Sequence, residues 1–132
     1  MTFSVHPRLE ADSFFIADWP LCRVLLMNDT RYPWLILVPR RDDMTEWMDL
    51  TIEDRALLTE EIARAGGAVR GLPSVTKVNI GALGNLVPQL HVHILGRHSG
   101  DPAGPGPVWG HSAAIPYETS ARDALIGLVR SL

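Results

Sequence analysis

The segment Gln89–Leu95, with the sequence QLHVHIL, alternates between polar and apolar residues. Successive side chains of a β-strand point to opposite faces, so the pattern predicts a strand with one face on the core. The apolar face comprises Leu90, Val92 and Ile94. Gln89, His91 and His93 share the other face, and a rise of ~3.3 Å per residue places the two imidazoles about 6–7 Å apart at the backbone. This spacing lets both rings contact one phosphate.

Shorter apolar runs between turn residues predict four further strands, at 14–17, 22–27, 34–38 and 74–80. Thr51 is expected to cap a helix, because acidic residues follow it in the first turn. The helical pattern weakens or ends at Gly66-Gly67, and Ser120 is the expected cap of a C-terminal helix. The sequence therefore predicts an α+β fold: an antiparallel sheet of about five strands, with one main helix and a C-terminal helix on one face.

The length predicts a single domain over residues 1–132, with a motif region at 79–97 and a Pro/Gly-rich loop and helix at 98–132. The net charge of −3 argues against binding nucleic acid by bulk charge. The single cysteine, Cys22, makes no internal disulfide and is expected in packing. No secretory signal is evident, and no apolar stretch reaches the ~18–20 residues of a membrane span. We therefore expect a cytoplasmic protein with neither nucleic acid nor membrane as partner.

A glycine-bearing loop precedes the histidine strand. Gly81 and Gly84 allow the backbone to approach a ligand closely, so that its N–H groups can converge on an anion. An anion cradle followed by two imidazoles fits phosphoryl or nucleotidyl transfer through a histidine.

A pair of histidines two residues apart also occurs in zinc sites, because neutral imidazole is a common metal ligand. A third ligand would come from His6, His98, His111 or a carboxylate, and none of them lies at a telling spacing. We therefore expect no metal and no other cofactor.

The segment Gln89–Leu95 resembles the signature of the histidine triad (HIT) family, His-φ-His-φ-His-φ-φ, where φ is apolar, with glutamine in the first position. Asn79-Ile80-Gly81 is similar to the residues that precede this signature. Asn28-Asp29, followed by the strand that ends at Leu37-Val38-Pro39, is similar to an earlier part of the family pattern. The resemblance extends from about Cys22 to Arg97. It implies nucleotide phosphate chemistry without an obligatory metal, and a homodimer.

The resemblance also implies roles for individual residues. His91 would attack the α-phosphorus of a nucleotide and form a nucleotidyl-histidine that water hydrolyses, while His93 would bind and neutralise the phosphate oxygens. Gln89 retains the backbone carbonyl that orients the nucleophile, but its side chain does not titrate near neutral pH. The implied nucleotide-binding residues are Asn79, Gly84, Asn85, Asn28, Asp29 and Trp109. For Trp109, the alternative is a hydrophobic anchor of its loop. Trp34 is expected in the core or in a dimer contact.

Two hypotheses of different classes follow. The first is a hydrolase or transferase that acts at the α-phosphate of dinucleoside polyphosphates or nucleoside phosphoramidates. The second is a nucleotide-binding module with little or no catalysis. Gln89 makes the second credible, as does Leu86, which stands where the family often has a leaving-group hydroxyl. A histidine-based metal hydrolase is a third and weaker alternative.

Overall fold

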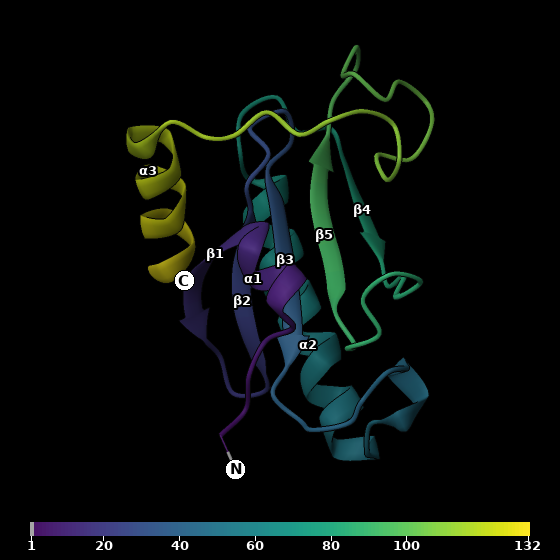
Figure 1. The fold of residues 1–132 in the computed structure, drawn as a ribbon. Helices are drawn as coiled ribbons and strands as arrows, with labels where there is room; N and C mark the ends of the chain where they lie inside the picture. The colour runs from purple at the N-terminus through teal and green to yellow at the C-terminus, as the bar shows by residue number, and fades with distance from the viewer. Residues whose placement is uncertain (1) are drawn as a thin grey trace.

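A five-stranded antiparallel sheet forms the centre of the computed structural model, which describes residues 2–132 (Figure 1). The strand order is β1-β2-β3-β5-β4. The strands are β1 (Ser13–Asp18), β2 (Cys22–Met27), β3 (Trp34–Pro39), β4 (Lys77–Gly81) and β5 (Val92–Arg97). The predicted α+β fold is confirmed. The histidine strand, however, begins at Val92 rather than at Gln89, so Gln89 and His91 lie in the segment just before β5. The β3–β5 ladder starts at the pair Leu37 and Val92, close to the end of β3 at Pro39.

The main helix, α2 (Ile52–Arg70), begins as predicted, with the Thr51 hydroxyl accepting a hydrogen bond from the backbone N–H of Asp54 at 3.1 Å. The expected end at Gly66-Gly67 is wrong, because the helix continues through both glycines. Each glycine costs about 1 kcal/mol relative to alanine in a helix. Burial of Val69 on the sheet, beyond the glycines, offsets this cost.

The C-terminal helix, α3 (Thr119–Arg130), is present as predicted, but its N-cap is Glu118 rather than Ser120. Two further helical turns were not predicted: the 3₁₀ turn Trp47–Asp49 and the short helix α1 (Pro7–Ala11). In α1, Pro7 occupies the first position, where its missing N–H costs nothing, and the His6 ring accepts from the backbone N–H of Arg8.

The sheet separates two apolar clusters, and helices cover both of its faces. On one face, α2 and α3 pack on a cluster that includes Val24, Leu26, Leu35, Leu37, Leu58, Ala65, Val92, Ile94 and Val129. The other face carries a cluster of Val5, Leu9, Leu25, Tyr32, Trp34, Ile36, Val38, Val87, Leu95 and Val108. The two predicted helices, α2 and α3, therefore share one face as expected, whereas α1, which was not expected, lies on the opposite side of the sheet from α2 (Figure 1).

The predicted alternation of the histidine segment is confirmed. Val92 and Ile94 point into the cluster beneath α2, whereas His93 pairs with Ile36 of β3 and Gly81 of β4 on the other face. After β5, residues 98–118 cross back over the ends of the strands to reach α3 beside β1 (Figure 1). Within residues 2–132, none of the helices combines the length and the apolar character needed to cross a membrane.

Gly96 tests the packing between β5 and α2. A Cβ atom at this position would lie 2.7 Å from Val75 Cγ2, 2.8 Å from Pro33 Cγ and 3.0 Å from Val69 Cγ1. Overpacking of this kind costs roughly 1–3 kcal/mol, so we expect Gly96→Ala to lower the free energy of unfolding by that amount in urea denaturation. The control is Gly67→Ala, where no atom lies within 4 Å and a gain of about 0.5–1 kcal/mol is expected. Equal stability of Gly96→Ala and the wild type would contradict the packing described.

Candidate functional site

A cavity of about 540 Å³ opens on the α1 face of the sheet. Its walls come from α1 with the residue that follows it, the end of β2 with the following turn, the loop before β5, and residues 108–114; Trp34 of β3 and His93 of β5 also line it. Of the residues predicted from the sequence, the cavity brings together His91, His93, Gly84, Asn85, Asp29 and Trp109. The structure thus gathers most of the predicted site from segments far apart in sequence.

The His91 ring is held by the backbone of Gln89. Its Nδ1 lies 2.7 Å from the Gln89 carbonyl oxygen, which is the contact expected from the sequence. A carbonyl only accepts, so Nδ1 carries the hydrogen and the neutral ring has its lone pair on Nε2. Burial lowers the pKa of His91 below its usual 6.5; the hydrogen bond to Gln89 opposes this shift and the nearby His6 adds to it. His91 is therefore a neutral imidazole with a nucleophilic Nε2 at neutral pH.

The His93 ring has the opposite arrangement. The indole Nε1–H of Trp34 donates to His93 Nδ1 at 3.0 Å, and because an indole only donates, Nδ1 is the acceptor and Nε2 carries the hydrogen. Burial, with a smaller contribution from His91, lowers the pKa of His93 to about 3. His93 therefore offers a neutral N–H donor. The expectation that it neutralises phosphate charge does not fit this environment.

Trp34 is the residue whose role the sequence did not indicate. Trp34 lies in the apolar cluster on this face of the sheet, as expected, and its indole also determines which nitrogen of His93 bears the hydrogen. The ring centroids of Trp34 and Trp109 lie 5.6 and 5.5 Å from that of His93, and the centroid of His91 lies 4.9 Å away. Alternation along β3 places Trp34 on the same face as Ile36, the partner of His93. Recognising this requires the strand order, which the sequence pattern does not provide.

The loop before β5 lines the cavity. Gly84 has a φ of +82°, a conformation that favours glycine. Within residues 2–132, the backbone N–H groups of Gly84, Asn85 and Leu86 donate to no protein acceptor. Free amides beside a cavity are suited to bind an anion. The Leu86 side chain is 76% exposed and brings no hydroxyl.

Gly81 and Trp109 are linked by packing. A Cβ atom on Gly81 would lie 3.1 Å from Trp109 Cη2, so a side chain at this position would push against the indole ring. Trp109 lines the cavity of its own chain, and its buried Nε1 has no hydrogen-bond partner within residues 2–132. The absence of a side chain at Gly81 therefore allows the indole of Trp109 to pack closely against this position.

Two predicted binding residues do not line the cavity. The Asn79 side chain accepts from Arg97 Nη1 at 3.0 Å and borders a separate hollow of about 510 Å³. The Asn28 side chain accepts from the backbone N–H of Tyr117 at 2.8 Å. Asn79 is thus engaged with the last residue of β5, and Asn28 with the segment that follows β5.

Asp29 lines the cavity, and Arg31 compensates its charge. The Asp29 carboxylate accepts from the backbone and the guanidinium of Arg31, with the closest contact at 2.8 Å, and from the backbone N–H of Ile115. Burial on its own raises the pKa of Asp29, but these hydrogen bonds together hold it below 3.8. Asp29 is therefore an ionised carboxylate whose charge is balanced by Arg31.

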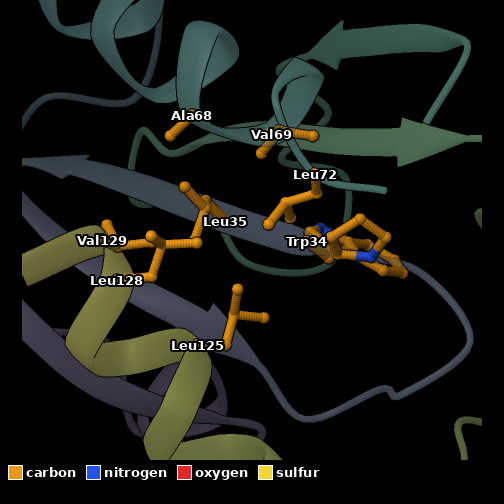
Figure 2. A pocket seen from close by; sticks show the side chains of 9 residues that line it. Trp34, Leu35, Ala68, Val69, Leu72, Leu125, Leu128 and Val129 are labelled. Carbon is orange, nitrogen blue, oxygen red and sulfur yellow. The ribbon is translucent and has the colours of Figure 1, made fainter. Parts of the chain in front are cut away.

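Other features of the molecule add no chemistry to this site. A hollow of about 10 Å³ between β3, α2 and α3 is lined by apolar residues such as Leu35, Val69, Leu72 and Leu125 (Figure 2). In the described part of the chain, no group of three or more His, Cys, Asp or Glu side chains is arranged to hold a metal ion.

The burial of neutral His93 predicts how stability depends on pH. In the unfolded chain its imidazole takes up a proton near pH 6.5, but in the folded protein only near pH 3. Stability is therefore lost progressively as the pH falls from about 6.5 towards 3. We expect His93→Asn, which keeps an acceptor for Trp34 but does not titrate, to lose less stability than the wild type between pH 7.5 and pH 5, by on the order of 2 kcal/mol. Urea denaturation at both pH values measures the difference, and identical losses would contradict the burial of a neutral ring.

Comparison with known proteins places this chain in a family. The family model described as HIT domain matches residues 8–100. The structure is similar to a histidine triad protein from Bradyrhizobium japonicum, with a TM-score of 0.96 and 44% identity over 99% of this chain and 98% of that chain. It is also similar to a histidine triad (HIT) protein from Sinorhizobium meliloti 1021, with a TM-score of 0.95 and 44% identity over 98% and 96% of the two chains.

A histidine triad protein from Marinobacter aquaeolei VT8 has a TM-score of 0.95 and 40% identity over 99% of this chain and 96% of that chain. Among the curated proteins, none matches the sequence significantly. The family model alone covers well over half of the chain. The chain therefore belongs to the HIT domain family, whose members are generally nucleotide hydrolases or transferases.

Proposed function

We propose that the protein is a nucleotide hydrolase or transferase that acts at the α-phosphate of dinucleoside polyphosphates or nucleoside phosphoramidates. One observation carries the proposal: two buried imidazoles with opposite tautomers stand side by side in the cavity, their centroids 4.9 Å apart. One ring offers a lone pair and the other an N–H donor. In this proposal Gln89 occupies the first position of the histidine triad.

The reaction starts with attack of His91 Nε2 on the α-phosphorus. A P–N bond forms, the bond from phosphorus to the leaving group breaks, and its electron pair departs with the leaving group. Water then attacks the phosphorus of the nucleotidyl-histidine: a P–O bond forms, the P–N bond breaks with its electron pair returning to Nε2, and one proton of the water is released to solvent with the nucleotide. The Gln89 carbonyl accepts from Nδ1–H throughout and stabilises the positive charge on the substituted ring.

His93 and the loop amides bind the phosphate oxygens in this scheme. The His93 Nε2–H and the free N–H groups of Gly84 and Asn85 are neutral donors beside the cavity. Fixed donors of this kind stabilise the charge that builds up on phosphorus-bound oxygens in the transition state. Because Leu86 has no hydroxyl to protonate the departing group, the proposal favours leaving groups that depart as stable anions, such as phosphates, over amines.

Replacement of His91 tests the nucleophile. We expect His91→Ala to reduce turnover of a diadenosine polyphosphate by more than about a thousandfold, since the covalent step is lost. After brief incubation, mass spectrometry of the wild type should find an acid-labile adduct of one AMP on the His91 peptide. Because the pKa of His91 is lowered, wild-type activity should be flat above about pH 6.5 and fall only at more acid pH. His98→Asn, outside the cavity, is the matched control, and full activity of His91→Ala would exclude this mechanism.

Replacement of Trp34 tests the positioning of His93. Without the indole N–H, Nδ1 of His93 is free to take the hydrogen, so Trp34→Phe should populate both tautomers. Nitrogen-15 NMR of the histidine rings should show a single Nε2–H tautomer in the wild type and a mixture in the variant. Phosphate binding should weaken severalfold, as in His93→Ala. A variant with an unchanged His93 spectrum would show that Trp34 does not set the tautomer.

The second candidate is a nucleotide-binding module with little or no catalysis. The exposed, purely apolar Leu86 beside the cavity favours it, because no side chain at that position assists a leaving group. Calorimetry that detects AMP binding, together with no product from any dinucleotide, would select this alternative.

The proposal also includes a cytoplasmic homodimer. The edge strand β4 exposes Ile80, and the adjacent loop exposes Leu83 and Leu86, so apolar surface is available for a second copy of the chain. This surface supports the dimer that the family resemblance implies.

A further inference from the structure

We propose that α1 is a substrate-recognition element: Gln89 holds it over the cavity, and Arg8 binds the phosphate groups that lie beyond the α-phosphate. This inference rests on the proposed function and extends it, because it assigns the glutamine of the triad position to substrate binding through another segment.

The side chain of Gln89 is committed to the N-terminal segment. Its Oε1 accepts from the backbone N–H of His6 at 2.7 Å, and its Nε2 donates to the backbone carbonyl of Ser4 at 3.0 Å. The amide therefore satisfies one donor and one acceptor of a segment more than 80 residues away in sequence. An imidazole in its place would not reproduce this pair of contacts with the same geometry, since its donor and acceptor are fixed in a five-membered ring.

The N-terminal segment that Gln89 contacts, from Ser4 to His6, leads directly into α1, which forms part of the cavity wall. Val5, between the two clamped residues, is buried, and Leu9 of α1 is 6% exposed, both in the cluster on this face of the sheet. Arg8 and Asp12, at either end of the same turn, line the cavity. Gln89 therefore fixes the position of α1 relative to the histidines, while its own carbonyl orients His91.

The side chains at the base of the cavity supply no free positive charge to bind a polyphosphate. Both histidines are neutral at neutral pH, and the Arg31 guanidinium is engaged by Asp29 and Ser112. Arg8 is exposed at the rim and makes no hydrogen bond or ion pair through its side chain within residues 2–132. Asp12, the residue after α1, also lines the cavity, and in the described part of the chain its carboxylate forms no ion pair with Arg8.

A polyphosphate substrate brings several negative charges, and a guanidinium matches phosphate oxygens with two N–H donors. The neutral donors on the floor suffice for orientation of one phosphate, whereas the additional charges require Arg8. The ligand class that fits the cavity is thus a nucleotide with at least one phosphate beyond the α-phosphate.

Calorimetry with AMP and ADP tests the role of Arg8. We expect the wild type to bind ADP more tightly than AMP, and Arg8→Gln to weaken ADP binding about tenfold but AMP binding less than about threefold. Arg8→Lys should retain part of the preference, and Arg70→Gln, an exposed arginine at the end of α2, should match the wild type. Raising the salt concentration should weaken ADP binding by the wild type more than by Arg8→Gln.

The outcomes distinguish this inference from the proposed function. Equal ADP affinities of Arg8→Gln and the wild type, with both proteins binding AMP, would overturn the role of Arg8 and leave the proposed function standing. A wild type that binds neither nucleotide would overturn both.

A double-mutant cycle tests whether Gln89 acts through α1. Gln89→Leu keeps the backbone carbonyl that orients His91 but removes both side-chain hydrogen bonds. We expect faster hydrogen exchange in residues 3–11, weaker ADP binding, and no further loss when Arg8→Gln is added. Additive losses, or unchanged exchange in residues 3–11, would overturn the assignment of Gln89 as the residue that holds α1.

Discussion

Two hydrogen bonds of opposite sense, at the Nδ1 atoms of neighbouring histidines, determine the hydrogen positions in the candidate site. A carbonyl oxygen faces His91 Nδ1, and an indole N–H faces His93 Nδ1. Because the first partner only accepts and the second only donates, the two rings are fixed in opposite tautomers. Their Nε2 atoms are consequently complementary: that of His91 carries a lone pair, and that of His93 carries a hydrogen that it can donate. Deep burial keeps both rings neutral, so this division of roles does not depend on protonation near pH 7.

The two histidines that line the cavity are neutral, which explains why the positive charge at this site lies at the edge of the cavity. Two buried cationic imidazoles 4.9 Å apart would repel each other and would pay a large desolvation cost. The fold avoids both costs by keeping the imidazoles uncharged and by pairing Arg31 with Asp29. In the proposed function, an anionic substrate meets neutral donors at the reacting phosphate and the guanidinium of Arg8 on the exposed helix α1. In this arrangement, neutral donors position the reacting phosphate, and a separate cationic group attracts the remaining negative charge of the substrate.

The segment after β5 is held by polar contacts that serve the cavity indirectly. Arg97 forms a buried ion pair with Asp101 at 2.8 Å and also donates to Asn79 and to two backbone carbonyls of the loop. Removing one partner of such a pair is costly, because a buried charge is left uncompensated. Asn28 performs a similar task near α3. These contacts bring Trp109 against His93 and Gly81, so both asparagines support the shape of the site from outside it.

Local pattern in the sequence determined the strands, the main helix and the shared face of His91 and His93, since alternation and capping act between residues close in the chain. The positive φ of Gly84 likewise follows from a local property, the freedom of glycine to adopt this conformation. Only the tertiary structure decided the continuation of α2 through Gly66-Gly67, the pairing of Trp34 with His93 and the clamp from Gln89 to the N-terminal segment. Each of these depends on contacts between residues distant in sequence, and no local preference specifies which partner a buried polar group or a helix face will meet.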